Sequence, residues 1–178
     1  SKAALLGHSM GGKLAMTFAL LYPHRVTKLI AADVAPVAYP ARHNNIFSGL
    51  FAVDIANLSS RAQADEQLSA FVHEAGVRQF LLKSLIKEDD KFHWRFNLNA
   101  LKANYSALTD APMAEGQYDG PVLFIKGSES DYILPEHKDV ITRLFPNAHA
   151  KIIQGTGHWL HAEKPAAFTR LVQEFLLR

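Results

Sequence analysis

The chain has 178 residues, of which 48% are apolar, and this is enough for one domain with a substantial core or for one domain with an insertion. A net charge of +2 and the lack of a lysine or arginine cluster argue against nucleic-acid binding, and no apolar run approaches the length of a membrane span. The absence of cysteine excludes disulfides, thiol chemistry and thiolate metal sites, and it weakly favours a cytoplasmic location.

The first motif along the chain is GHSMG at residues 7–11, between an apolar run at 3–6 and a predicted helix from Lys13 to Leu21. A Gly-x-Ser-x-Gly sequence between a strand and a helix is typical of a nucleophile elbow, a tight turn that holds a serine clear of its surroundings. Because such a turn strains the serine backbone, we expect Gly7 and Gly11 to leave room around Ser9. The alternative is a glycine-rich turn whose serine has no chemical role.

Three further apolar runs predict strands, at about 26–32, at 121–126 and within AHAKIIQG at 148–155. The chain closes with an amphipathic helix in EKPAAFTRLVQEFLLR. Because strands separated by helices favour a parallel sheet covered on both faces, the sequence predicts an α/β fold.

The segment from 37 to 115 has a mostly helical pattern. SSRAQADEQLSAFVHEAG carries a serine N-cap signal and a glycine stop, and a second helical run, VRQFLLKSL, follows at once. We therefore expect core segments at 1–36 and 116–178, with a helical cap at 37–115 inserted between them.

A second chemical motif, GTGHW, follows the last predicted strand. Reactive groups collect at the carboxyl ends of parallel strands, so His158 and Ser9 are expected at the same sheet edge. This placement makes His158 the candidate base for the Ser9 proton, although a lone histidine is often purely structural. His8, inside the turn, and Trp159, beside His158, are candidates for substrate contact, with a structural role as the simpler alternative.

These motifs, together with PHRVTKLIAADVAPVAY, GVRQFLLKSL, WRFN and GTGHWLHAEKP, resemble the α/β-hydrolases and, more narrowly, the small bacterial YbfF-type esterases. The resemblance implies a Ser–His–Asp hydrolase that cleaves carboxylic esters or thioesters of short to medium acyl chains through an acyl-enzyme, with no metal or other cofactor. It also implies that the backbone N–H of Met10 belongs to the oxyanion hole. The partner would be a small-molecule ester or thioester, and the oligomeric state is left open.

An α/β-hydrolase has several strands and helices ahead of its elbow, including a loop that supplies a second oxyanion-hole N–H. The resemblance therefore implies that the N-terminal half of the core is absent from the sequence. We expect residues 1–178 alone to hydrolyse esters weakly or not at all, because the second donor is missing. The first strand is also expected to leave an open, apolar sheet edge.

The acid of the triad has two candidate positions. In most α/β-hydrolases it follows the next-to-last strand, here in KGSESDYILP, where the usual spacing falls on Ser130 and Asp131 comes one residue late. YbfF-type esterases instead have an aspartate just after the strand that follows the elbow, and Asp33 matches this position. We therefore favour Asp33 over Asp131, with Glu129 as a further carboxylate on the same loop; the alternative is that Asp33 only caps the next turn.

Other functions use the same fold. A C–C hydrolase or a perhydrolase would use the same triad, and a non-catalytic binding module could keep the fold without the chemistry. An aspartate-nucleophile dehalogenase is argued against, because position 9 is serine.

Overall fold

The computed structural model describes residues 1–112 and 116–177. The chain divides into two compact units, the first from Ser1 to Tyr39 and again from Asp110 onward, and the second from Pro40 to Thr109. The second unit falls inside the predicted cap at 37–115, whose predicted end at 115 lies outside the described residues. The boundaries 1–36, 37–115 and 116–178 therefore stay a prediction.

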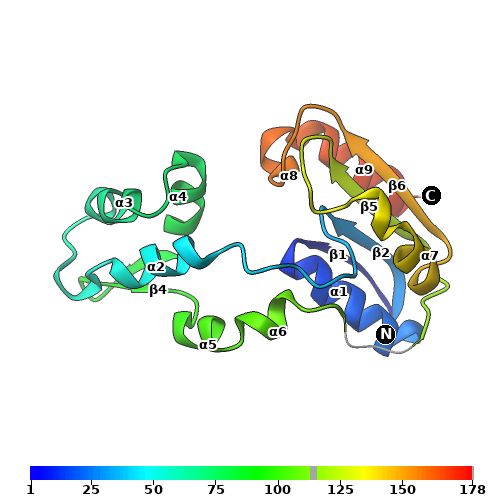
Figure 1. Ribbon diagram of the computed structural model, residues 1–178, viewed down its shortest axis with the longest axis horizontal. Helices are drawn as coiled ribbons and strands as arrows, with labels where there is room; N and C mark the ends of the chain where they lie inside the picture. The colour runs from blue at the N-terminus through cyan, green and yellow to red at the C-terminus, as the bar shows by residue number, and fades with distance from the viewer. Residues whose placement is uncertain (113–115, 178) are drawn as a thin grey trace. The chain divides into compact units, whose positions relative to one another are not determined.

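The first unit is a parallel sheet with helices on both faces, which confirms the predicted α/β class (Figure 1). Its strands run in the order β1-β2-β5-β6, and each neighbouring pair is parallel. Its helices and strands are β1 (Ala3–His8), α1 (Met10–Leu21), β2 (Val26–Ala32), β5 (Val122–Gly127), α7 (Lys138–Leu144), β6 (Ala148–Ile153), α8 (Leu160–Glu163) and α9 (Pro165–Leu177), with short 3₁₀ turns at η1 (Pro23–Arg25) and η3 (Pro135–His137). The predicted strands agree with β2, β5 and β6 to within two residues.

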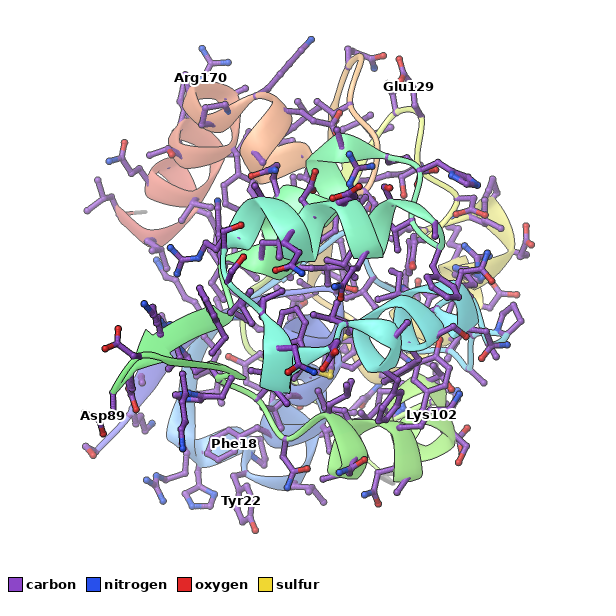
Figure 2. The ribbon with its side chains drawn as sticks, turned by 90° about the vertical axis from the view of Figure 1, so that its left-hand side faces the viewer. Phe18, Tyr22, Asp89, Lys102, Glu129 and Arg170 are labelled. Atoms are coloured by element: carbon purple, nitrogen blue, oxygen red, sulfur yellow. The ribbon has the colours of Figure 1, made fainter. Side chains whose placement is uncertain are left out.

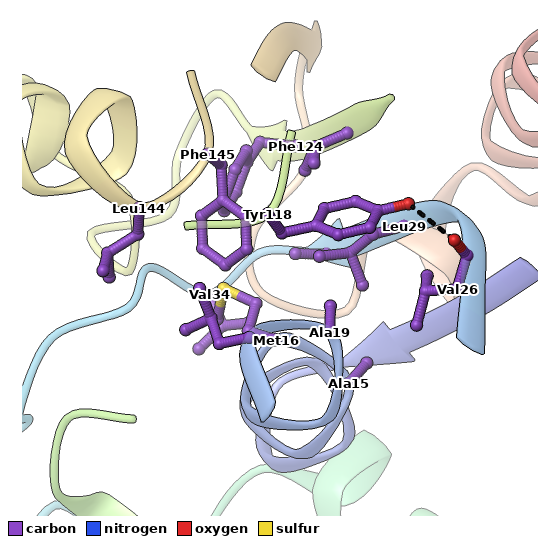
Figure 3. Packing of buried hydrophobic residues seen from close by; sticks show 13 residues of the cluster. Ala15, Met16, Ala19, Val26, Leu29, Val34, Tyr118, Phe124, Leu144 and Phe145 are labelled. Carbon is purple, nitrogen blue, oxygen red and sulfur yellow. Dashed lines mark hydrogen bonds between the residues drawn. The ribbon is translucent and has the colours of Figure 1, made fainter. Parts of the chain in front are cut away.

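Alternate residues of the central strands pack on opposite faces of this sheet, as the pleat requires. Leu29 of β2 and Phe124 of β5 belong to the core formed with α1 and α7, which Figure 3 shows from close by. Ile30 and Ile125, their neighbours along the two strands, belong to the core formed with α8 and α9. The apolar runs that predicted β2 and β5 thus reflect strands that are covered on both faces.

The sheet core also includes residues outside the strands. The Tyr118 hydroxyl donates a hydrogen bond of 3.3 Å to the Val26 carbonyl at the start of β2 (Figure 3).

The strand order leaves β1 at one end of the sheet, and its Leu6 side chain is exposed. No helix within the described residues is both long enough and apolar enough to span a membrane.

The second unit combines helices with a small antiparallel hairpin. Its elements are α2 (Asn44–Ala52), η2 (Ile55–Asn57), α3 (Arg61–Ser69), α4 (Ala75–Leu82), β3 (Leu85–Glu88), β4 (Lys91–Trp94), α5 (Leu98–Ala103) and α6 (Tyr105–Thr109). A separate apolar core joins α2, α3, α4 and the hairpin, with Leu68 and Leu85 fully buried.

The hairpin was not expected in a segment with a mostly helical pattern. It pairs Leu85 with Trp94 and Glu88 with Lys91, and it turns at Asp89 and Asp90, which both have positive φ. Two residues in the left-handed region are the signature of a type I′ hairpin turn, and aspartate is among the residues that tolerate it. The Asp-Asp pair was therefore the signal in the sequence that the helical interpretation missed.

The helix predicted across 59–76 is interrupted. Its N-terminus was predicted correctly, since the Ser60 side chain accepts from the Gln63 N–H and caps α3, but α3 ends at Ser69 and Gly76 lies inside α4 instead of stopping a helix. Arg78 stabilises the break, because its guanidinium donates to the Val72 and His73 carbonyls and pairs with Asp65. A buried core on both sides of the break overrides local helix propensity.

Candidate active site

The carboxyl ends of the four parallel strands lie along one edge of the sheet, and this edge positions the candidate site. The Ser9 N–H, just past β1, donates to the Ala32 carbonyl at 3.1 Å, and the Asp33 N–H, just past β2, donates to the Ile125 carbonyl at 2.7 Å. Backbone pairing thus continues one residue beyond each strand and fixes the start of each loop.

The turn at Ser9 has the geometry of a nucleophile elbow. Ser9 has φ 53° and ψ −120°, a left-handed conformation that is costly for a residue with a side chain. It begins α1, because its carbonyl accepts from the Gly12 and Lys13 N–H groups. The strand–turn–helix arrangement leaves the hydroxyl at the sheet edge.

Close packing at this turn depends on Gly7 and Gly12. A Cβ at Gly7 would lie 2.1 Å from the Gly11 carbonyl oxygen, and a Cβ at Gly12 would lie 2.4 Å from a methyl group of Val34. Apart from its chain neighbours and the backbone of its own helix, a Cβ at Gly11 would meet no described atom within 4 Å. The prediction that Gly11 leaves room for the turn is therefore wrong, because it is the next glycine that faces the neighbouring loop.

The structure brings together Ser9, His158 and Asp33. The His158 Nε2 atom lies 3.0 Å from Ser9 Oγ, and its Nδ1 atom lies 2.8 Å from Asp33 Oδ2. Because a carboxylate can only accept, Nδ1 carries the imidazole proton and Nε2 is left to accept from the serine hydroxyl. This hydrogen-bonded chain has the arrangement of a Ser–His–Asp triad.

The Asp33 carboxylate is fully buried, with 0% of the residue exposed. Its Oδ1 accepts from the Gly127 N–H at 3.0 Å, and its Oδ2 accepts from the Ser130 hydroxyl as well as from His158. Buried charge is costly unless it is hydrogen-bonded, and three donors meet this requirement. The backbone of Asp33 also has positive φ, 48°, so the loop is turned sharply to aim the side chain at the sheet edge.

The other candidate acids lie elsewhere on the loop after β5. Ser130, at the usual acid position, donates to Asp33, and Asp131, one residue later, is exposed. Glu129 is also exposed and lies on the outside of this loop (Figure 2). The serine at position 130 thus supports a carboxylate that comes from the neighbouring strand.

Three residues contact His158 in ways that the sequence did not predict. The Tyr132 ring stacks on the imidazole, with ring centroids 3.8 Å apart and an angle of 15° between the planes. The His8 Nε2 atom lies 2.8 Å from the His158 carbonyl oxygen, and Trp159 packs edge-on to the His158 ring. His8 and Trp159, predicted to contact substrate, therefore both contact His158.

Lys13, on α1, is a further buried residue, and no role at the site was predicted for it. Its ammonium donates to the Val37 carbonyl at 2.8 Å and to the Asp110 carbonyl, and it lies 4.8 Å from the centre of the Tyr39 ring. Burial lowers the pKa of Lys13 from 10.5 to about 8. Lys13 thus links α1 to the main chain at Val37 and Asp110, within the first unit.

The predicted oxyanion donor, Met10, is the first residue of α1, and 53% of the residue is exposed. The first N–H groups of a helix have no carbonyl partner within the helix, so they are suited to bind an anion. No group of three or more His, Asp or Glu side chains in residues 1–112 and 116–177 is arranged to hold a metal ion.

Comparison with known proteins agrees with this geometry. A family model described as alpha/beta hydrolase fold matches residues 1–165. The chain belongs to the alpha/beta hydrolase fold family. It is 41% identical to the sn-1-specific diacylglycerol lipase ABHD11 of Mus musculus over 97% of this chain and 58% of the lipase, and 40% identical to Esterase YbfF of Escherichia coli (strain K12) over 98% of this chain and 67% of the esterase. The chain therefore spans about three fifths to two thirds of the length of these relatives.

A solved structure, that of a marine microorganism esterase, superimposes with a TM-score of 0.92 at 34% identity, over 98% of this chain and 70% of that one. In an α/β-hydrolase the Gly-x-Ser-x-Gly turn lies between a strand and a helix at the top of the sheet. The GHSMG turn between β1 and α1 occupies this position. The resemblance to YbfF-type esterases drawn from the motifs is confirmed over nearly the whole chain.

Proposed function

We propose that this chain carries the catalytic residues of a serine ester hydrolase, with Ser9 as nucleophile, His158 as general base and Asp33 as the acid that orients the base. The observation that carries the proposal is the unbroken hydrogen-bonded chain from Ser9 Oγ through the His158 ring to the buried carboxylate of Asp33. Serine is a poor nucleophile unless a base accepts its proton as it attacks. The three side chains supply this arrangement.

Acylation begins when Ser9 Oγ attacks the ester carbonyl carbon and His158 Nε2 takes the hydroxyl proton. The resulting imidazolium is stabilised by the Asp33 carboxylate at Nδ1. When the tetrahedral intermediate collapses, the bond to the leaving oxygen breaks and His158 returns the proton to that oxygen. Water then attacks the acyl-enzyme while His158 takes a proton from it. When this second tetrahedral intermediate collapses, the bond to Ser9 Oγ breaks, His158 gives the proton to that oxygen, and the carboxylic acid is released.

The negative oxygen of each intermediate requires hydrogen-bond donors that are already in place. We assign one donor to the Met10 backbone N–H, at the first turn of α1, where the helix dipole also favours negative charge. The loss of one such donor typically costs roughly 10²–10³ in rate. The oxyanion hole is therefore a separate contribution from the triad.

The proposed substrate is a carboxylic ester with a short to medium acyl chain, or the corresponding thioester. The names of the relatives, a diacylglycerol lipase and an esterase, support hydrolysis of an ester. Trp159 is proposed to contact the substrate beside His158. A cytoplasmic location stays a prediction based on the cysteine-free sequence.

The test is active-site labelling combined with turnover. The full-length protein, rather than residues 1–178 alone, is the one to test. It is expected to react with a fluorophosphonate probe at Ser9 and to hydrolyse p-nitrophenyl esters of short acyl chains. Ser9→Ala should abolish both, whereas Ser48→Ala, at an exposed serine on α2, should leave both unchanged. Ester hydrolysis by Ser9→Ala within tenfold of the parent, or a parent that is neither labelled nor active, would refute the proposal.

A further inference from the structure

The His8 side chain contacts the main chain of the residue proposed as the base. His8 is the last residue of β1 and directly precedes Ser9. Its Nε2 atom lies 2.8 Å from the carbonyl oxygen of His158, a residue 150 positions away. Because a carbonyl oxygen only accepts hydrogen bonds, the proton of the neutral His8 ring is on Nε2.

The surroundings of His8 keep its ring neutral. The pKa of His8 is lowered to about 4, mainly by burial and also by the nearby His158 and His161 rings, against the opposing effects of the His158 carbonyl and Asp33. The ring centroids of these two neighbours lie 4.7 Å and 4.4 Å from that of His8. At neutral pH His8 is therefore a fixed N–H donor, with its Nε2 atom committed to the backbone of His158.

This contact closes a ring of bonds that includes two members of the triad, Ser9 and His158. The peptide bond joins His8 to Ser9, Ser9 Oγ bonds to the His158 imidazole at 3.0 Å, and the His158 carbonyl bonds back to His8 at 2.8 Å. We propose that His8 is a positioning residue, whose Nε2–H group fixes the main chain of His158 so that its imidazole stays in hydrogen-bonding reach of Ser9. This inference rests on the proposed function, because it assigns His8 a part in that same triad.

A second side chain, that of Glu163, binds two further N–H groups of the same loop. The Glu163 carboxylate of α8 accepts from the Gly157 N–H at 2.8 Å and from the Trp159 N–H at 3.2 Å. Glu163 is exposed, so water competes for these bonds, which join the loop to the helix α8 that follows it. The His8 bond is more sheltered, and it joins the loop to the strand that carries Ser9.

Positioning and substrate contact predict different kinetics. A misplaced catalytic group lowers kcat, and a displacement of about 1 Å can cost roughly 10²-fold. Loss of a substrate contact that is equal in the ground state and the transition state raises KM and leaves kcat unchanged. The His8 variants therefore distinguish the two roles.

The decisive comparison is His8→Gln against His8→Asn in the intact protein. The glutamine amide reaches about as far as imidazole Nε2, whereas the asparagine amide reaches only the Nδ1 position. We expect His8→Gln to keep kcat for a p-nitrophenyl ester within about fivefold of the parent, and His8→Asn and His8→Leu to lose roughly 10- to 100-fold in kcat with KM within about threefold. His24→Gln, at an exposed histidine of η1, is the matched control and should behave as the parent.

Equal kcat values for His8→Gln and His8→Asn would overturn the positioning role, and so would a raised KM with unchanged kcat. The comparison of the two amides holds even if His8→Leu does not fold.

A parent that hydrolyses no ester would refute the proposed function instead, and a second readout then tests the position of His158. The low-field proton resonance of the His158–Asp33 hydrogen bond should stay sharp in His8→Gln and broaden or vanish in His8→Asn, and identical spectra would overturn the inference.

Discussion

Replacement of Asp33 by asparagine tests the third member of the triad, and the structure specifies what the substitution does. Asparagine has the shape of aspartate, and its amide oxygen can still accept from the Gly127 N–H, which lies 3.0 Å from Oδ1 in the parent. Its NH₂ group would then face His158 Nδ1 in place of the oxygen that accepts at 2.8 Å. Because this NH₂ group is a donor, Nδ1 must become an acceptor and the proton moves to Nε2, where it blocks acceptance from Ser9.

The expected size of the effect follows from two overlapping contributions. A charge-assisted hydrogen bond contributes about 1.5–3 kcal/mol. Attraction between an imidazolium and a carboxylate about 4 Å apart contributes about 4 kcal/mol at an effective dielectric constant of about 20. A combined loss of roughly 4–6 kcal/mol in the transition state corresponds to a rate reduced roughly 10³- to 10⁴-fold.

The assay measures kcat/KM of the intact protein for one p-nitrophenyl ester, at a pH where the parent is fully active. Asp33→Asn should show the 10³- to 10⁴-fold loss and keep a cooperative urea transition, because the buried site still accommodates the side chain. Asp131→Asn, at an exposed carboxylate, should change the rate by less than about tenfold. If Asp131→Asn is the impaired variant, or if Asp33→Asn keeps more than about a tenth of the parent activity, the assignment of the acid is refuted.

Four further substitutions test a donor to the triad acid, two glycines at the elbow and the buried Lys13. Ser130→Ala removes one of three donors to Asp33 and should lower kcat/KM about 2- to 10-fold, so a loss above about 100-fold would contradict the supporting role assigned to this hydroxyl. Gly7→Ala places a Cβ 2.1 Å from a backbone oxygen and should lower the free energy of unfolding, measured in urea, by about 3 kcal/mol or more. Gly11→Ala should change this free energy by less than about 1 kcal/mol. Equal effects of the two substitutions would refute the packing argument. Between pH 8 and 10.5 the unfolded chain binds more protons at Lys13 than the folded chain does. The unfolding free energy of the parent should therefore rise with pH relative to that of Lys13→Met. Urea titrations of both proteins at about pH 7 and pH 9.5 measure this difference, and the lack of a rise would contradict the lowered pKa of Lys13.

The sequence by itself determined the features that a few neighbouring residues encode. A strand–turn–helix around a serine needs only an apolar run, small residues and a helix former, so GHSMG located Ser9 and its elbow without any tertiary information. The strands at about 26–32 and 121–126 followed from apolar runs, because β2 and β5 are covered on both faces of the sheet. The strand within 148–155 was also predicted, although most residues of β6 are exposed. The Gly-x-Gly loop before His158 likewise indicated which histidine reaches the sheet edge.

Only the tertiary structure decided which atoms meet across long stretches of chain. The carboxylate at His158 comes from a strand 125 residues earlier, and the donor to the His158 carbonyl comes from 150 residues earlier, so spacing along the sequence could rank Asp33 and Asp131 but could not measure either distance. A glycine is needed at 12 rather than at 11 because of a methyl group of Val34. Val34 lies in the loop after β2, so the residues around the two glycines do not reveal this contact. Local patterns fix backbone conformation, whereas the partner of a buried polar group is set by which strands lie side by side in the sheet.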